Sequence, residues 1–174
     1  MAVAEIIGAS IGVLLLVMVA YLLVGGTLNA AETAATAQKD LTLLEEARLR
    51  TSITISDIEP TLGGNTLNFS VTNNGNEIIP DLPHMDVFSF NTTNGYMHYT
   101  YVKNEAVPPE QLDPATMADY TWSDTWYEND HIHTRELDPN VTMRIMTKLP
   151  AGVTPDNIQV ITSNGVSAVS NVPT

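Results

Sequence analysis

The feature that most constrains the fold is an uncharged apolar run of nineteen residues, from Ile6 to Val24, which directly follows Glu5. An α-helix rises about 1.5 Å per residue, so a helix continued to Leu28 would be about 34 Å long, enough to cross a hydrocarbon core of about 30 Å. Twelve residues of the run are Ile, Leu or Val. At about 0.3 to 0.6 kcal/mol each, they favour the bilayer by about 4 to 7 kcal/mol. The run therefore predicts a helix that spans a membrane once.

A removable signal peptide is the alternative explanation for an N-terminal apolar run. Such peptides begin with positive charge and have an apolar segment of about 7 to 15 residues before a small-residue cleavage site. This chain has no Lys or Arg before Lys39, and its apolar run is longer. We therefore expect the helix to be retained.

The segment from Leu28 to Arg50 is rich in Ala, Leu, Glu and Arg and contains neither Pro nor Gly. These residues favour a helix, so the membrane span should continue as a stalk and form one helix within residues 1–50. Leu41, Leu44 and Ala47 form a stripe at helical spacing. That stripe needs a neighbour, either this chain's own domain or a second copy.

After Arg50 the apolar period changes from 3.6 to 2, which predicts strands over residues 51–174. Predicted strands cover residues 53–55, 67–71, 87–90, 96–101, 120–122, 125–127, 141–148, 158–162 and 166–169, with Asn-Gly turns and a Pro-rich loop over 107–119. The fold class is α+β, a long helix followed by an all-β immunoglobulin-like sandwich without the Cys pair of antibody domains. A jelly roll is the competing fold. The spacing of parallel α/β enzymes is missing.

The charge excludes nucleic acid as a partner. The net charge is −13, and from Thr51 onward 15 Asp and Glu face four Lys and Arg, a net of −11. Such a surface repels phosphate backbones. The chain has no Cys, so it offers no disulfide or thiol chemistry.

The sequence contains no nucleophile elbow, zinc-protease motif, phosphate loop or dinucleotide fingerprint, so we expect no enzyme and no cofactor. No metal site is predicted; Asp130, His131 and His133 are weak candidates, since positions 131 and 133 share a face on a strand. A polar loop explains them more simply. Trp122 and Trp126, with neighbouring tyrosines, form an aromatic cluster that we expect in the core rather than on a recognition surface.

Three N-glycosylation sequons begin at Asn68, Asn91 and Asn140. Their clustering beyond the predicted span favours an exterior β domain. The cations nearest the span, Lys39 and Arg48 among them, lie on the domain side and favour the opposite orientation.

Gly8 and Gly12 form a small-xxx-small pair that would let two membrane helices approach closely. Glu5 can sit among lipid headgroups at little cost. In a packed helical filament it would instead need a cation. Glu5, Gly8 and Gly12 are therefore the candidate residues for helix association.

Several stretches resemble the archaellum (archaeal flagellum) accessory protein F family of methanogenic archaea: the apolar run after Glu5, TAQKDLTLLEEARLR, LNFSVTNNGNEIIP, HMDVF and ITSNGVSA. The resemblance covers most of the chain. It implies a membrane helix with an external β-sandwich that anchors the archaellum to the surface layer. The implied partners are the surface-layer protein, other archaellum components and a second copy of the chain.

The apolar run is also similar to archaellins and type IV pilin-like proteins, whose N-terminal helices pack into a surface filament. A filament subunit is therefore the alternative function, and an extracellular filament the alternative location. A subunit precursor should carry Lys or Arg ahead of the run, and this sequence shows none there. If Met1 is the initiator, we therefore expect an anchor rather than a fibre. A generic anchored adhesin is a third class of function, which requires only the sandwich and its acidic face.

Overall fold

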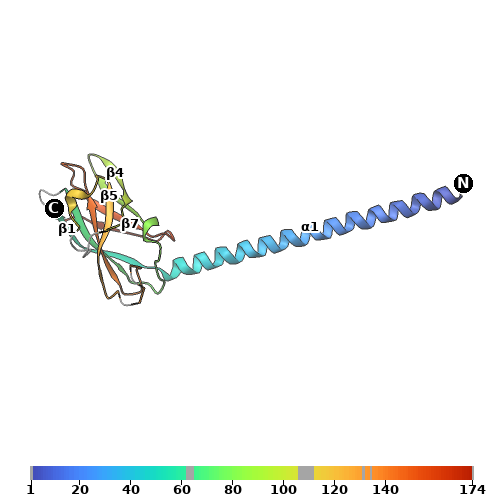
Figure 1. Cartoon of the computed structure of the whole chain (residues 1–174), viewed down its shortest axis with the longest axis horizontal. Coiled ribbons are helices and arrows are strands. Elements are labelled where there is room, and N and C mark those ends of the chain that lie inside the picture. Colours follow the sequence, from blue (N-terminus) through green and yellow to red (C-terminus); the bar gives the residue numbers. More distant parts are fainter. Residues whose placement is uncertain (1, 62–64, 106–111, 131, 134, 174) are drawn as a thin grey trace. The chain divides into compact units, whose positions relative to one another are not determined.

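The computed structural model describes residues 2–61, 65–105, 112–130, 132–133 and 135–173. The chain comprises two compact units, Met1–Glu45 and Glu46–Thr174. One uninterrupted helix, α1 (Ala2–Arg50), comprises the described residues of the first unit and the first residues of the second (Figure 1). Hydroxyl groups along α1, such as those of Ser10, Thr33 and Thr42, donate to the carbonyl four residues earlier. These polar side chains are therefore satisfied within the helix itself.

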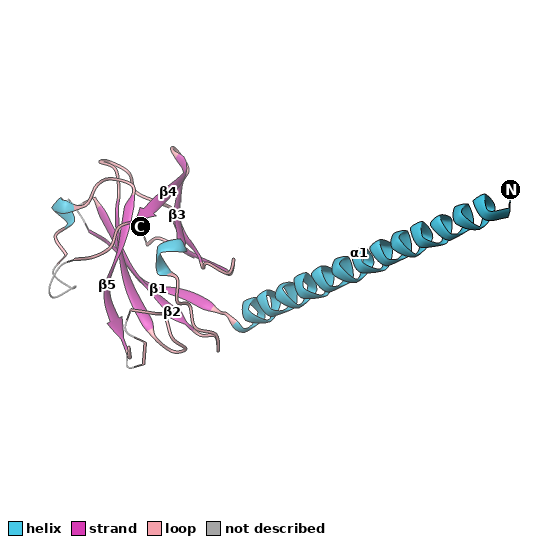
Figure 2. Cartoon of the chain, turned by 45° about the vertical axis from the view of Figure 1, so that its right-hand side comes forward, coloured by secondary structure: helices cyan, strands magenta, loops and turns pink. Residues whose placement is uncertain are grey.

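The second unit contains eight strands among its described residues (Figure 2). They are β1 (Ile53–Thr61), β2 (Thr66–Asn73), β3 (Asp86–Asn91), β4 (Gly95–Tyr101), β5 (Thr121–Glu128), β6 (Thr142–Lys148), β7 (Asn157–Ile161) and β8 (Ser167–Asn171). Two short 3₁₀ helices, η1 (Leu82–His84) and η3 (Pro114–Thr116), lie in the connections.

The strand order is β1-β2-β6-β5-β4-β3-β7-β8. The first four strands form one antiparallel layer and the last four form the other. A short parallel pairing links the two layers, in which Thr100 pairs with Thr121 and Tyr101 with Trp122. In chain order these strands correspond to A, B, C, C′, D, E, F and G of an immunoglobulin fold, with A-B-E-D facing C′-C-F-G. The predicted α+β class with an immunoglobulin-like sandwich is confirmed, and the order is not that of a jelly roll.

The core lies between the two layers and follows the predicted alternation. Along β6, Met143, Ile145 and Thr147 are fully buried, while the residues between them are partly exposed. The other side chains with at most 1% exposure include Leu67, Phe69, Val71, Val87, Tyr99, Trp122, Ile158 and Val160. Each fully buried aliphatic or aromatic side chain stabilises the fold by about 1.5 to 3 kcal/mol.

The structure differs from the expected strands at β1, which continues to Thr61 instead of covering residues 53–55, and at β5. The segments predicted separately over residues 120–122 and 125–127 form the single strand β5, whose register with β6 shifts between Asp124 and Trp126. Of the loop predicted over 107–119, residues 107–111 lie outside the described residues, and the rest contains η3.

Candidate functional sites

By length and composition α1 qualifies to cross a membrane, as the sequence predicts. Within its own unit, its apolar side chains have no other element to pack against among the described residues. Leu16 is 72% exposed and Leu22 71% exposed. This half of the helix therefore has an apolar surface that its own unit leaves uncovered.

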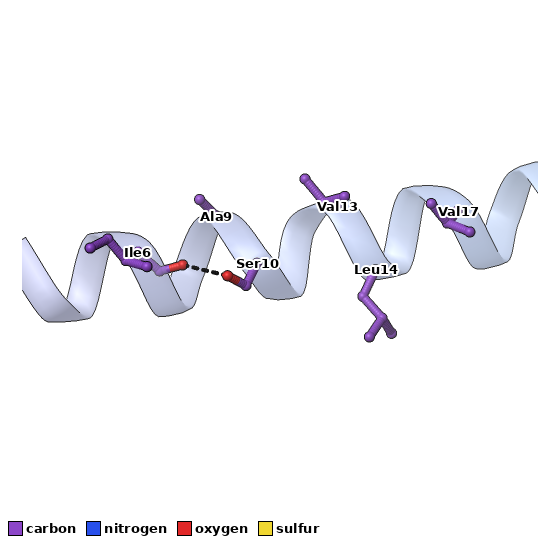
Figure 3. Close-up of a pocket in the computed structure, with 6 residues that line it drawn as sticks. All are labelled: Ile6, Ala9, Ser10, Val13, Leu14 and Val17. Atoms are coloured by element: carbon purple, nitrogen blue, oxygen red, sulfur yellow. Dashed lines mark hydrogen bonds between the residues drawn. The ribbon is translucent and has the colours of Figure 1, made fainter.

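A shallow groove runs along one face of this helix, formed by the six residues in Figure 3, Ile6, Ala9, Ser10, Val13, Leu14 and Val17. The groove exists because Ala9 and Ser10 are small. The Ser10 hydroxyl donates to the Ile6 carbonyl at 2.8 Å, so it can face an apolar environment without an unsatisfied donor.

The predicted association residues Gly8 and Gly12 lie on the opposite side of α1 from this groove, given about 100° of rotation per residue. A Cβ added at either glycine would meet nothing within 4 Å in the described chain. Glycine in a helix interior costs about 1 kcal/mol relative to Ala, so these glycines are not required by the fold of the chain itself. Glu5 is exposed one turn before them. Helix association through these residues stays a prediction.

The end of α1 is fastened within the second unit by what we call the helix-end joint, which comprises residues 50–52, 73–77 and Asn164. The backbone N–H of Asn76 donates to the Arg50 carbonyl at 2.8 Å, and that of Asn74 donates to Ser52 at 2.8 Å. Asn164 donates from Nδ2 to the Thr51 hydroxyl at 2.6 Å.

Gly75 lies where the joint is most crowded. A Cβ there would stand 2.4 Å from the Arg50 carbonyl oxygen and 2.6 Å from the Ser52 nitrogen. The Arg50 guanidinium also lies 3.7 Å from the Glu77 carboxylate. Only glycine at position 75 permits this close approach of the two backbones.

Of the three weak metal candidates, the two that the structure describes, Asp130 and His133, bond to different partners. His131 lies outside the described residues. Asp130 accepts a hydrogen bond from the Arg135 backbone through Oδ2, and its Oδ1 is buried with no partner in the described part of the chain. His133 instead lies beside Asp138, with Nδ1 and Oδ1 2.9 Å apart.

The described residues that could hold a metal at this loop are His133, Glu136 and Asp138, whose ligand atoms lie within 4.8 Å of one another. Two ligands of one Zn²⁺, each at about 2.0 to 2.2 Å, stand no more than about 4.4 Å apart, so these side chains would have to close further. The hydrogen bond and charge of Asp138 raise the pKa of His133 above its ordinary value. The arrangement is that of a His-Asp pair that closes a loop.

A buried network that sequence reasoning missed is centred on Asp124, which is 1% exposed. Its carboxylate accepts hydrogen bonds from the hydroxyls of Tyr101 and Tyr127, at 2.9 and 3.0 Å, and from the Arg135 guanidinium at 2.7 Å. Burial and the neighbouring carboxylate raise the pKa of Tyr101 to about 12 and raise that of Tyr127 further. Both tyrosines stay neutral and donate, so the network fastens the 129–138 loop to the sheet.

The three sequons have different surroundings. Asn91 uses both ends of its amide in a turn: Nδ2 donates to Thr154, and Oδ1 accepts from the backbones of Thr93 and Asn94. Asn140 is exposed, with a positive φ of 66° in the turn before β6. Asn68 lies in the middle of β2 and lines a groove on the outer face of the β1-β2-β6-β5 layer.

The predicted aromatic cluster divides between core and surface. Trp122 is fully buried and packs on Tyr101, with ring centroids 4.7 Å apart. Trp126 is 41% exposed on the outer face of the same layer. The expectation of core packing is therefore confirmed for Trp122 and wrong for Trp126.

No family model and no curated protein matches this sequence. Among solved structures, the chain is similar to the archaellum periplasmic stator protein FlaG from Sulfolobus acidocaldarius, with a TM-score of 0.48 and 20% identity over 69% of this chain and 97% of that chain. It is also similar to the complex of archaellum periplasmic stator proteins FlaF and FlaG from the same organism, with a TM-score of 0.47 and 19% identity over 68% of this chain and 85% of that chain. At these identities the likeness concerns the fold.

Proposed function

We propose that this chain is a non-enzymatic structural component of the archaeal motility apparatus. One pass of α1 holds it in the cell membrane, and the β-sandwich lies outside the cell. There the sandwich binds the surface-layer protein and other archaellum components, and so anchors the archaellum. Self-association through the Gly8 and Gly12 face of α1 is part of this proposal.

The observation that carries the proposal is the contrast between the two units. The sandwich has a complete core of its own, whereas the apolar half of α1 is exposed along its whole length in the described chain. Apolar surface contributes about 25 cal/mol per Å² when it leaves water, so a helix of this kind needs lipid or other helices around it.

The helix-end joint supports an anchor. The stretches NNGNEIIP (73–80) and ITSNGVSA (161–168), on which the family resemblance depends, supply its residues Asn74, Gly75, Asn76 and Asn164. An anchor must transmit load between its membrane helix and its binding domain. Residues that fasten the end of α1 serve that purpose directly.

The second candidate function is a filament subunit, an archaellin or archaeal type IV pilin, whose helix packs with its neighbours. It is favoured by the same uncovered helix, because lipid and neighbouring helices are both apolar surroundings. The two functions differ in what surrounds α1, which is lipid for an anchor and neighbouring helices for a filament subunit.

Cell fractionation tests the proposal. We expect the native protein to remain with membranes, to be released only by detergent, and to be absent from filaments sheared from cells. Recovery of the protein as a major component of sheared filaments would establish the subunit function and refute the anchor.

The orientation needs its own test, and the absence of Cys makes one available. Ser163 is exposed in the β7–β8 hairpin. A Ser163→Cys variant in intact cells should react with a membrane-impermeant maleimide, while the Cys-free parent provides the blank. Labelling only after lysis would place the sandwich inside the cell.

A further inference from the structure

The outward position of Trp126 is produced by a β-bulge in β5. Asp124 pairs with Ile145 and Trp126 pairs with Arg144, so Thr125 is an extra residue with no partner in the ladder. Trp122 and Asp124 both point into the core, at 0% and 1% exposure. Regular alternation would send Trp126 inward as well; the bulge turns it to the outer face. The exposure of this aromatic ring is therefore a property of the backbone.

Trp126 forms one wall of the outer-face groove, which has a volume of about 400 Å³ and is lined also by Asn68, Thr125, Arg144 and Met146. The groove crosses three strands, since Asn68 on β2 pairs with Met146 on β6, and Arg144 pairs with Trp126 on β5. Arg144 already forms an ion pair with Glu59 on β1. The groove therefore offers an aromatic face and hydrogen-bonding groups with no uncompensated charge.

Asn68 is the acceptor residue of the sequon Asn68-Phe69-Ser70. Phe69 is fully buried in the core, so Asn68 and Ser70 both lie on the outer face. The Oδ1 of Asn68 is buried and has no hydrogen-bond partner in the described part of the chain. Asn68 itself lines the groove, and its amide nitrogen is the atom that a sequon modification uses.

We propose that Asn68 carries an N-linked glycan and that the groove seats the first sugar of that glycan against the Trp126 ring. A sugar presents an apolar C–H face that packs on an aromatic ring, and hydroxyl groups that bond to Arg144 and Thr125. A neutral sugar matches the compensated charge of the groove, and attachment at Asn68 places it there without a separate binding event. This inference rests on the proposed function, because it requires the sandwich to lie outside the cell.

The modification transfers an oligosaccharide from a lipid phosphate donor. The bond between sugar C1 and the donor's phosphate oxygen breaks, and a bond from C1 to Nδ2 of Asn68 forms. The amide gives up one proton, which balances the lipid phosphate that leaves. Asn68 keeps its Oδ1 and one N–H, so its place on β2 is unchanged.

The other sequons serve as comparisons within the same chain. A glycan on Asn91 would disturb an amide that holds a turn at both ends. Asn140 is exposed but does not line the groove. Loss of the Asn140 sequon should therefore leave Trp126 unaffected.

Peptide mapping by mass spectrometry of the full-length protein, extracted from native membranes, tests the modification. We expect the peptide with Asn68 to carry a glycan and the peptide with Asn91 to be unmodified. An unmodified Asn68 would overturn the inference. If Ser163→Cys is labelled from outside the cell, only this inference has failed; if it is labelled only after lysis, the proposed orientation has failed too.

Iodide quenching of tryptophan fluorescence tests the seat of the sugar, because the chain has two Trp and Trp122 is fully buried. We expect the glycan to protect Trp126 from iodide in the native protein. The fluorescence of Trp126 should therefore be quenched more strongly in N68Q than in the native protein. Ser70→Ala should give the same gain, because it removes the sequon and keeps Asn68. N140Q should quench like the native protein. A modified Asn68 with equal quenching in the native protein and in Ser70→Ala would overturn the seating on Trp126.

Discussion

Replacement of Gly75 by Ala would disrupt the contacts of the helix-end joint and would leave the side chains of the sandwich core unchanged. The added Cβ would stand 2.4 Å from the Arg50 carbonyl oxygen, whereas ordinary contacts begin at 3.4 Å. The two backbones must therefore separate by about 1 Å. The bond from Asn76 to Arg50, now 2.8 Å, would stretch beyond hydrogen-bonding distance, and the bond from Gly75 to Ser52 would weaken with it.

The expected cost follows from these contacts. Two backbone hydrogen bonds contribute about 1 to 3 kcal/mol together, and the strain of overpacking adds about 1 to 3 kcal/mol. The lower entropy of unfolded Ala returns about 0.4 to 1 kcal/mol. We expect the free energy of unfolding of the sandwich to fall by about 2 to 4 kcal/mol, which for a domain of this size lowers Tm by about 8 to 16 °C.

Urea unfolding of the full chain in detergent, followed by the fluorescence of buried Trp122, measures this change. Gly165→Ala is the matched control: φ is +83° there and the space around a Cβ is open, so only the left-handed backbone, at about 1 to 2 kcal/mol, should matter. Gly12→Ala should leave the sandwich unchanged. If Gly75→Ala is as stable as the parent, or loses no more than Gly165→Ala, then the joint does not hold the end of α1 as described.

Three further predictions concern the polar clusters. Arg135→Met leaves buried Asp124 without its cation and should lower the free energy of unfolding by about 3 kcal/mol in urea unfolding; a loss under about 1 kcal/mol would mean that the tyrosine hydroxyls suffice. The hydrogen bond and charge of Asp81 raise the pKa of His84, so the pair stabilises the fold fully below the unfolded pKa of about 6.5 and the effect is lost as pH rises through the folded pKa. In NMR titrations Asp81→Asn should return the His84 pKa to its ordinary value, and an unchanged midpoint would contradict this cause. Zn²⁺ should bind weakly at His133, without saturation at micromolar metal in calorimetry, and tight binding that His133→Ala abolishes would show that the site is preformed.

The sequence predicts most of the fold because alternation and helix propensity act locally. The continuous α1 and the inward residues of β2, such as Leu67 and Phe69, follow from period alone. The bulge at Thr125 could not be predicted this way, since an extra residue has no signature beyond the gap that split β5 into two predicted pieces. The network around Asp124 could not be predicted from the sequence either. Arg135 and Tyr101 contact Asp124 only once the sheet has formed.

The candidate sites likewise include features that the local sequence predicts and features that depend on contacts between distant residues. Sequons are local and were found, but their difference in surroundings depends on pairing between distant strands, as Asn68 with Met146 shows. The special need for glycine at position 75 likewise arises from a contact with Arg50, and an Asn-Gly turn alone would not reveal it. Functional surfaces in this chain come from the placement of ordinary residues rather than from a motif.

The association face of α1 can be tested because its two apolar faces differ and the chain has no Cys. Gly12 and Ser10 lie about 160° apart around the helix, so Gly12→Cys and Ser10→Cys report opposite faces at nearly the same membrane depth. If glycines mediate close packing, Gly12→Cys should form disulfide dimers in native membranes much more readily than Ser10→Cys. Equal crosslinking would mean that α1 rotates freely or meets neighbours on every side. In a filament core both faces are covered, so dominance of the glycine face would itself favour the anchor over the fibre.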